Sequence, residues 1–167
     1  MEARHVGLAL AAGTLVADQA NKLWLMDVFD IAHRGPVRLT PFFEVVMARN
    51  PGISYSLLSA HSASGRYALL LFAAVACLMI GAWLWRTTTI LVALGLGLIL
   101  GGALGNAIDR FAYGWVADFY YFHVGSFHWY VFNIADVAIV IGVALLLADS
   151  FFLAPKRTAA TAASRAR

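Results

Sequence analysis

The chain has 167 residues, of which 62% are hydrophobic and 13% are charged, and this charged fraction is about half the value typical of a soluble globular domain. Such a composition excludes a soluble fold, because the apolar surface is too large for one core to bury. The net charge of +3 comes from basic residues that form no continuous stripe, so we expect membrane lipids, and not nucleic acid, as the acidic partner.

Four apolar stretches have the length of about 20 residues that a helix needs to cross a bilayer. They lie at about residues 5–25, 67–85, 90–108 and 131–153. The second and third are joined only by residues 86–89, so we expect an antiparallel hairpin, and the longer connections 27–66 and 109–130 then share the opposite face. The sequence therefore predicts an all-α membrane protein with four transmembrane helices in one domain, residues 1–155.

The lysines and arginines set the expected orientation, because cytoplasmic segments carry an excess of them. One side of the membrane holds Arg4, Arg86 and the four cations of a tail at residues 156–167, which we expect to be disordered. The opposite side holds five cations in longer segments, where charge counts less: Arg34, Arg38, Arg49, Arg66 and Arg110. We therefore place both termini in the cytoplasm and both long connections outside.

The two long connections have different compositions. Residues 37–39 and 42–47 look extended and are punctuated by prolines and glycines, which predicts a small β-rich extracytoplasmic cap. Residues 111–132 hold 11 of the 22 aromatic residues of the chain. This density is typical of a segment in the membrane interface, where amphipathic rings are favoured.

Three glycines of the third predicted helix are spaced four residues apart, at Gly97, Gly101 and Gly105. This spacing gives the helix one smooth face. We expect that face to pack closely against a neighbouring helix, as small residues do in membranes.

Ionisable residues at membrane depth indicate a functional site, because each costs at least about 2.5 kcal/mol to insert. The predicted helices bring such groups to one bilayer face, the outer one, where Asp118 of the aromatic segment also lies. The groups on the helices are the pair Asp18 and Lys22, the trio Asn106, Asp109 and Arg110, and the pair Asn133 and Asp136. The spacing of Asp18 and Lys22, four residues apart with the acid first, favours an ion pair.

The residues at this face favour carboxylate chemistry. No serine or cysteine has an obvious base nearby, and the five histidines lack metal-ligand spacing, so we expect neither a metal nor a cofactor. Two carboxyls that share a site hold one proton between them, so the ionised acid can activate water while the protonated acid polarises a carbonyl. Asp118 and Asp136 are the best candidates, whereas Asp109, beside Arg110, resembles a paired structural acid.

Five ordered motifs resemble those of lipoprotein signal peptidase, signal peptidase II. They are Asp-Gln-Ala-Asn-Lys at 18–22, Arg-Asn-Pro-Gly at 49–52, Gly-Asn-Ala-Ile-Asp-Arg at 105–110, Val-Ala-Asp-Phe at 116–119 and Phe-Asn-Ile-Ala-Asp at 132–136. The chain departs from the usual first-loop motif at Ile53 and Tyr55. The resemblance implies a bacterial inner-membrane aspartyl endopeptidase that removes the signal peptide from diacylglyceryl-modified prolipoproteins, cuts before the lipidated cysteine and is inhibited by globomycin.

The resemblance also implies roles for individual residues. Asp118 and Asp136 match the catalytic pair. The residues that match the lining or support of the pocket are Asn50, Asn106, Asp109, Arg110, Asn133, Asp18 and Lys22.

Two other functions remain open at this point. A proton- or ion-coupled transporter also needs intramembrane acids, although it should carry them across the whole bilayer depth. A non-catalytic membrane scaffold would use the acids to pair its helices, and loss of Asp118 would then deplete the protein.

Overall fold

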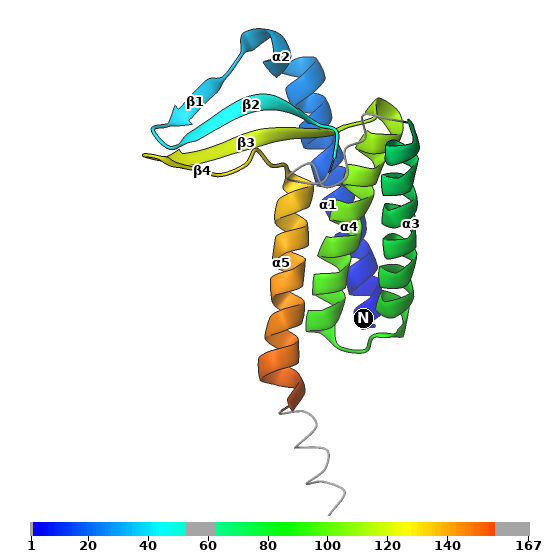
Figure 1. Ribbon diagram of the computed structural model, residues 1–167. Coiled ribbons are helices and arrows are strands. Elements are labelled where there is room, and N and C mark those ends of the chain that lie inside the picture. Colours follow the sequence, from blue (N-terminus) through cyan, green and yellow to red (C-terminus); the bar gives the residue numbers. More distant parts are fainter. Residues whose placement is uncertain (1, 53–62, 156–167) are drawn as a thin grey trace, which may run out of the picture.

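The computed structural model describes residues 2–52 and 63–155 (Figure 1). Ile53, Tyr55, His61 and the predicted tail at 156–167 lie outside these described residues. The helices are α1 (Ala3–Leu23), α2 (Ile31–Arg34), α3 (Ala63–Arg86), α4 (Ile90–Tyr113) and α5 (Ile134–Ala148), and π-helical turns extend α1 over Trp24–Val28 and α5 over Asp149–Leu153. The strands are β1 (Val37–Thr40), β2 (Phe43–Asn50), β3 (Val116–Val124) and β4 (Phe127–His128).

Among the described residues, three helices are long and apolar enough to cross a membrane: Ser64–Arg86, Ile90–Tyr113 and Ile134–Leu153. The helix α1 is not one of them, so this criterion does not confirm the predicted count of four. The physical reason is composition, because α1 carries several charged and polar side chains, among them the buried Asp18 and Lys22.

The helices pack closely where small residues meet. A Cβ atom added to Gly97 would overlap the carbonyl oxygen of Gly7 on α1, and one added to Gly101 would lie 2.5 Å from the carbonyl oxygen of Ala11. On the other side of α4, a Cβ added to Gly95 would lie 2.9 Å from the carbonyl oxygen of Gly142 on α5. The predicted close packing along the glycine face is thus confirmed.

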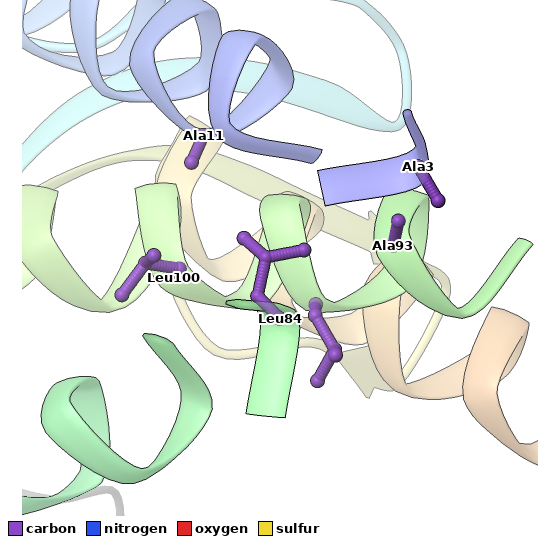
Figure 2. Close-up of a cluster of buried hydrophobic side chains, with 6 residues drawn as sticks. Ala3, Ala11, Leu84, Ala93 and Leu100 are labelled. Atoms are coloured by element: carbon purple, nitrogen blue, oxygen red, sulfur yellow. The ribbon is translucent and has the colours of Figure 1, made fainter. Parts of the chain in front are cut away.

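An apolar cluster fills the space between α1, α3 and α4 toward the N-terminal end of α1 (Figure 2). Leu84 and Leu96 are fully buried in it. The remaining members are Ala3, Ala11, Ala93 and Leu100.

A four-stranded antiparallel sheet with the order β1-β2-β3-β4 projects from the opposite end of the bundle (Figure 1). Strands β1 and β2 confirm the extended stretches predicted at 37–39 and 42–47. The all-α prediction was incomplete for residues 111–132, because this segment contains the end of α4 and the strands β3 and β4. In β3, Asp118 lies opposite Ala48 of β2, so the sheet positions a candidate catalytic acid.

The helix α5 begins later than the predicted residue 131. Phe132 exchanges backbone hydrogen bonds with Tyr120 of β3, at 3.0 Å and 2.8 Å, and is therefore held in extended backbone. Asn133 then caps the helix by accepting a hydrogen bond from the Asp136 N–H at 2.9 Å. The start of α5 is thus attached directly to the strand that carries Asp118.

Candidate active site

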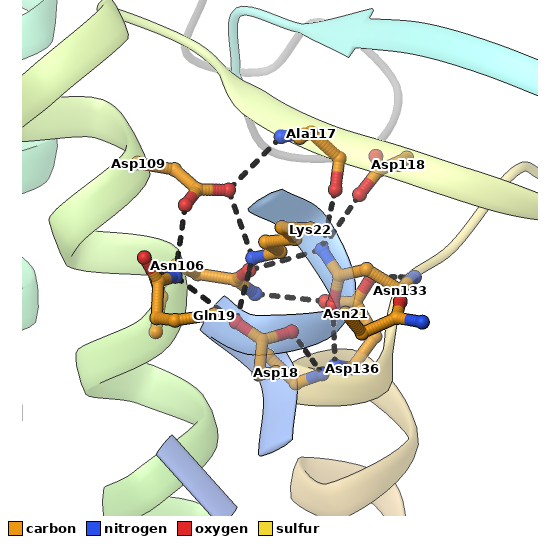
Figure 3. Close-up of polar contacts among 12 residues, drawn as sticks. Asp18, Gln19, Asn21, Lys22, Asn106, Asp109, Ala117, Asp118, Asn133 and Asp136 are labelled. Atoms are coloured by element: carbon orange, nitrogen blue, oxygen red, sulfur yellow. Dashed lines mark hydrogen bonds and ion pairs between the residues drawn. The ribbon is translucent and has the colours of Figure 1, made fainter. Parts of the chain in front are cut away.

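Three buried charges from α1 and α4 meet where the bundle joins the sheet (Figure 3). The Lys22 Nζ lies 2.8 Å from a carboxylate oxygen of Asp18 and 2.8 Å from one of Asp109. All three side chains are almost fully buried. The predicted pairing of Asp18 with Lys22 is confirmed.

Asp109 is a paired acid, as predicted, but its partner is not the adjacent Arg110, because adjacent residues on a helix point in directions about 100° apart. Asp109 points inward to Lys22. Arg110 instead donates to the carbonyl oxygens of Asn106 at 3.2 Å and Gly52 at 3.4 Å.

Two asparagines hold the carboxylate of Asp118. Asn133 Nδ2 donates to Asp118 Oδ1 at 2.7 Å, and Asn50 Nδ2 donates to Asp118 Oδ2 at 3.1 Å. Burial of the carboxyl group, followed by repulsion from Asp136, raises the pKa of Asp118 to about 7, against the opposing effect of these hydrogen bonds and of Lys22. Asp118 is therefore poised to exchange a proton near neutral pH.

The carboxylate of Asp136 is also held on both oxygens. Oδ1 accepts a hydrogen bond from Asn106 Nδ2 at 2.9 Å, and Oδ2 accepts one from the backbone N–H of Asn133 at 3.2 Å. The second bond completes a capping box with the Asn133 side chain. The first turn of α5 and the carboxylate are thus fixed together.

Asn133 and Asn106 connect the two candidate catalytic acids. The Nδ2 group of Asn133, which contacts Asp118, also donates to Asn106 Oδ1 at 3.0 Å, and the same oxygen accepts from Lys22 Nζ at 3.2 Å. One hydrogen-bond network therefore joins α1, α4, β3 and α5 (Figure 3).

The two acids line one cavity of about 210 Å³. Its polar lining comes from Asn50, Gly52, Asn106, Arg110, Asp118 and Asp136. Beside it, a mostly apolar cavity of about 190 Å³ is lined by Asp136 and by Trp129, Tyr130, Phe132, Val137, Val140 and Ile141. The two cavities share Tyr130, Asp136 and Val140, so a polar and an apolar cavity meet at Asp136.

The structure brings together all nine residues predicted for the site, in two layers. Asn50, Asn106, Arg110, Asp118 and Asp136 line the cavity, whereas Asn133 and the Asp18–Lys22–Asp109 cluster support it from below. Sequence reasoning missed Gln19, which donates to Asp109 Oδ1 at 3.0 Å. A polar residue in an apolar helix, beside Asp18, was the available signal.

The described residues contain no cluster of the side chains that usually hold a metal ion. Within residues 2–52 and 63–155, no group of three His, Cys, Asp or Glu side chains is arranged to hold a metal ion. His123 lies 3.3 Å from Glu44, and His128 lies 2.6 Å from the hydroxyl of Tyr121, both out on the sheet. The described polar side chains that line the cavity include two carboxylates, two amides and one guanidinium group.

The chain is similar to known proteins over most of its length. Residues 10–152 match the family model of signal peptidase (SPase) II. A lipoprotein signal peptidase of Beijerinckia indica is 63% identical over 151 residues, with 90% of each chain covered. One of Methylocella silvestris is 63% identical over 154 residues, covering 92% of this chain and 90% of the relative. These relatives give no support to the transporter alternative.

The fold is also found in solved structures. A bacterial membrane enzyme determined by the in meso method at 1.9 Å resolution superposes with a TM-score of 0.75 at 23% identity, covering 88% of this chain and 93% of that one. A second such structure, at 2.3 Å resolution, gives a TM-score of 0.74 at 24% identity and covers 87% and 89%. At this level of identity the likeness concerns the fold.

Proposed function

This chain belongs to the signal peptidase II family of aspartic-type peptidases, and on that premise we propose that it removes the signal peptide from diacylglyceryl-modified prolipoproteins by cutting before the lipidated cysteine. The observation that carries the mechanism is that Asp118 and Asp136 line one cavity, each with its carboxylate held by separate hydrogen-bond donors. Two carboxyls in one pocket are sufficient for peptide hydrolysis without a covalent intermediate.

In the proposed reaction the pair holds a single proton. The ionised carboxylate takes a proton from water, which attacks the scissile carbonyl carbon, while the protonated carboxyl transfers its proton to the carbonyl oxygen to give a tetrahedral diol. The C–N bond then breaks as the carboxyl that holds the water proton passes it to the leaving amine and the other carboxylate takes a proton back from a diol hydroxyl, which restores the pair. The raised pKa of Asp118, about 7, supports this scheme because it keeps a proton on the pair up to neutral pH.

The asparagines would keep the two acids oriented through this cycle. Asn50 and Asn133 donate to Asp118, and Asn106 donates to Asp136. Amide donors stabilise each carboxylate without supplying a competing acidic proton to it. Arg110, which lines the same cavity, adds a positive charge where negative charge develops on the substrate.

We also propose that α1 is a fourth membrane span, which makes the protein a multi-pass protein of the bacterial inner membrane. Its packing against α4 along the glycine face, from Gly97 to Gly105, supports this, since α4 itself is a candidate span. The lysine and arginine distribution then puts both termini in the cytoplasm and the cavity near the extracytoplasmic face. A substrate anchored by its signal helix and its acyl chains would reach the cavity from the lipid.

The apolar cavity beside Asp136 suits that substrate. Its walls are the outward side of α5, at Val137, Val140 and Ile141, and the rings of Trp129 and Phe132. An acyl chain or the end of a signal helix placed here would hold the scissile bond beside the acids. Membrane lipids would fill the same surface in the free enzyme, and globomycin would compete for it together with the polar cavity.

The experiment that tests this function is cleavage of a diacylglyceryl-modified prolipoprotein by the purified protein in lipid or detergent. The wild type is compared with Asp118→Asn, Asp136→Asn and the control Asp30→Asn, which changes a half-exposed acid outside the cavity. We expect the wild type and Asp30→Asn to cut before the lipidated cysteine, with globomycin inhibiting both, and the two cavity variants to be folded and inactive.

Either of two results would overturn parts of the proposal. Failure of the folded wild type to cut a lipidated substrate would exclude the peptidase function. Cleavage by Asp118→Asn or Asp136→Asn at the wild-type rate would assign the chemistry to other groups. Mass spectrometry of the product locates the cut.

A further inference from the structure

The two carboxylates that flank Lys22 have a second, matching set of contacts. Asp18 Oδ1 accepts a hydrogen bond from the backbone N–H of Ala135 at 3.0 Å. Asp109 Oδ2 accepts one from the backbone N–H of Ala117 at 3.0 Å. Ala135 directly precedes Asp136, and Ala117 directly precedes Asp118. Each buried acid therefore holds the backbone one residue before a candidate catalytic acid.

Lys22 joins these two attachments into one unit. Its Nζ lies 2.8 Å from Asp18 and 2.8 Å from Asp109, so the ammonium group fixes how far apart the two carboxylates stand. Through them it fixes the separation of the α5 start from β3 (Figure 3). The contacts are out of water, since Lys22, Ala117 and Ala135 are at most 1% exposed, and electrostatic interactions are stronger there than at the surface.

Lys22 also determines how Asn106 is oriented. An ammonium group is a donor only, so the side-chain atom of Asn106 that meets it at 3.2 Å must be the carbonyl oxygen. The amide of Asn106 consequently turns its Nδ2 toward Asp136, 2.9 Å away. A reversed amide would place a carbonyl oxygen against the carboxylate of Asp136.

We propose that the Asp18–Lys22–Asp109 cluster is a positioning device that sets the separation of Asp118 and Asp136 through the backbones of Ala117 and Ala135. This inference rests on the proposed function and assigns the three charges no contact with substrate. A helix-packing role alone would require only that α1 and α4 stay together, which the glycine contacts already achieve. The cluster adds attachments to β3 and α5, at the residues next to the two acids.

A matched pair of double variants separates the positioning role from the charge. Asp18→Asn with Lys22→Met keeps an oxygen that can accept the Ala135 N–H, whereas Asp18→Leu with Lys22→Met removes it. Both remove one negative and one positive charge, so the net charge of the cluster is the same as in the wild type. Leu96→Ala is the control for loss of stability alone, because it creates a cavity in the apolar cluster, which lies away from the site.

Both variants lose the ammonium group that holds the two carboxylates, so we expect kcat to fall in both. We expect kcat of the Leu–Met variant to fall at least about tenfold below that of the Asn–Met variant with little change in KM, because only the Leu–Met variant also frees the backbone next to Asp136, and a shift of about 1 Å in a reacting group can cost about 100-fold. We also expect the alkaline limb of the pH profile to move to lower pH in the Leu–Met variant, since acids that move apart repel each other less. The charged groups that face the pair, Asp109 and Arg110, are the same in both variants.

A second measurement does not depend on cleavage. The rate at which a carbodiimide labels Asp118, followed by mass spectrometry over a range of pH, reports the protonation of that acid in the folded protein. A lower labelling midpoint in the Leu–Met variant than in the Asn–Met variant supports the positioning role, even where no substrate is cut. Equal midpoints in two folded variants, or equal kcat values and pH profiles, would overturn it. An effect of the same size in Leu96→Ala would also overturn it.

Discussion

The two ends of the helix bundle hold the same helices together by different means. Toward the N-terminal end of α1, backbones touch at glycines, as Gly97 does with Gly7 and Gly95 with Gly142, and Leu84 and Leu96 fill the remaining space. At the other end, charged and amide side chains span the gap between α1, α4, α5 and β3. Gly105 lies at the boundary, because a Cβ there would stand 2.5 Å from Asp18 Oδ2.

We interpret the closely packed end as the source of stability and the polar end as the source of active-site geometry. Close packing of small residues is a general solution for helices in lipid. A buried ion cluster, by contrast, is weak evidence for stability, because apolar residues of similar volume often do as well or better. The hydrogen bonds at the polar end orient the side chains, since each hydrogen bond fixes an angle as well as a distance.

The largest effect is expected from Asp136→Asn, which changes chemistry at the polar end. Cleavage should fall by about 10³-fold or more, because an amide cannot exchange a proton with water or the leaving amine. The capping of α5 should survive, since the Asn oxygen can still accept the Asn133 N–H. Parallel measurements of kcat and of the midpoint of thermal unfolding check this. A fall in kcat that is accompanied by a large fall in the unfolding midpoint would make Asp136 a structural residue.

The pH dependence of stability is the next largest effect. The folded-state pKa of Asp118, about 7, is raised above the unfolded value of about 3.9. Asp118 therefore contributes at most about 4 kcal/mol to the free energy of unfolding. This contribution is fully present below pH 4 and is lost as the pH rises through 7. Asp118→Asn should flatten this slope in unfolding measurements at pH 4 to 8. An unchanged slope in the variant would contradict the raised pKa.

At the closely packed end, Gly97→Ala should lower the free energy of unfolding by about 1–3 kcal/mol, because the new methyl group meets the backbone of Gly7. Gly13→Ala is the matched control on α1, where a Cβ would meet no other atom within 4 Å. It should stabilise the helix by about 0.5–1 kcal/mol. Both variants should keep the wild-type kcat. A large change in kcat for Gly97→Ala would contradict the assignment of stability to this end of the bundle and of active-site geometry to the other end.

The smallest effect is expected where the sheet meets α1. The hydroxyl of Tyr120 donates to Asn21 Oδ1 at 3.0 Å. Tyr120→Phe removes this bond and should cost about 1 kcal/mol of unfolding free energy. The rate of cleavage should fall only slightly, because the backbone pairing of residue 120 with Phe132 remains. Thermal unfolding and kcat test this. A loss as large as that of Asp136→Asn would instead make Tyr120 part of the catalytic machinery.

Hydropathy and depth were enough to predict much of this arrangement. The apolar stretches predicted the helices. The rule that ionisable groups at membrane depth have a function predicted that Asp18, Asp109 and Asp136 form a site at one end of the bundle. These signals are local or depend only on distance along a helix. The pairing of Asp18 with Lys22, four residues apart, is of the same kind.

The parts that the sequence did not predict depend on long-range register. Nothing local to Asp118 indicates that it lies opposite Ala48, which brings Asn50 within 3.1 Å of its carboxylate. Likewise, the partner of Asp109 is a lysine on another helix and not the adjacent arginine. The later start of α5 follows from the pairing of Phe132 with Tyr120, a contact between segments that no helix pattern encodes.

The order of the elements along the chain has a consequence for biosynthesis. The cavity takes its walls from β2, α4, β3 and α5, in that order, and α5 carries the Asp136 carboxylate. A chain that is still being translated and has not yet inserted α5 therefore lacks one acid of the pair and the donor Asn133 that holds the other. Under the proposed mechanism, such a nascent chain would therefore be unable to hydrolyse peptides until α5 is in place.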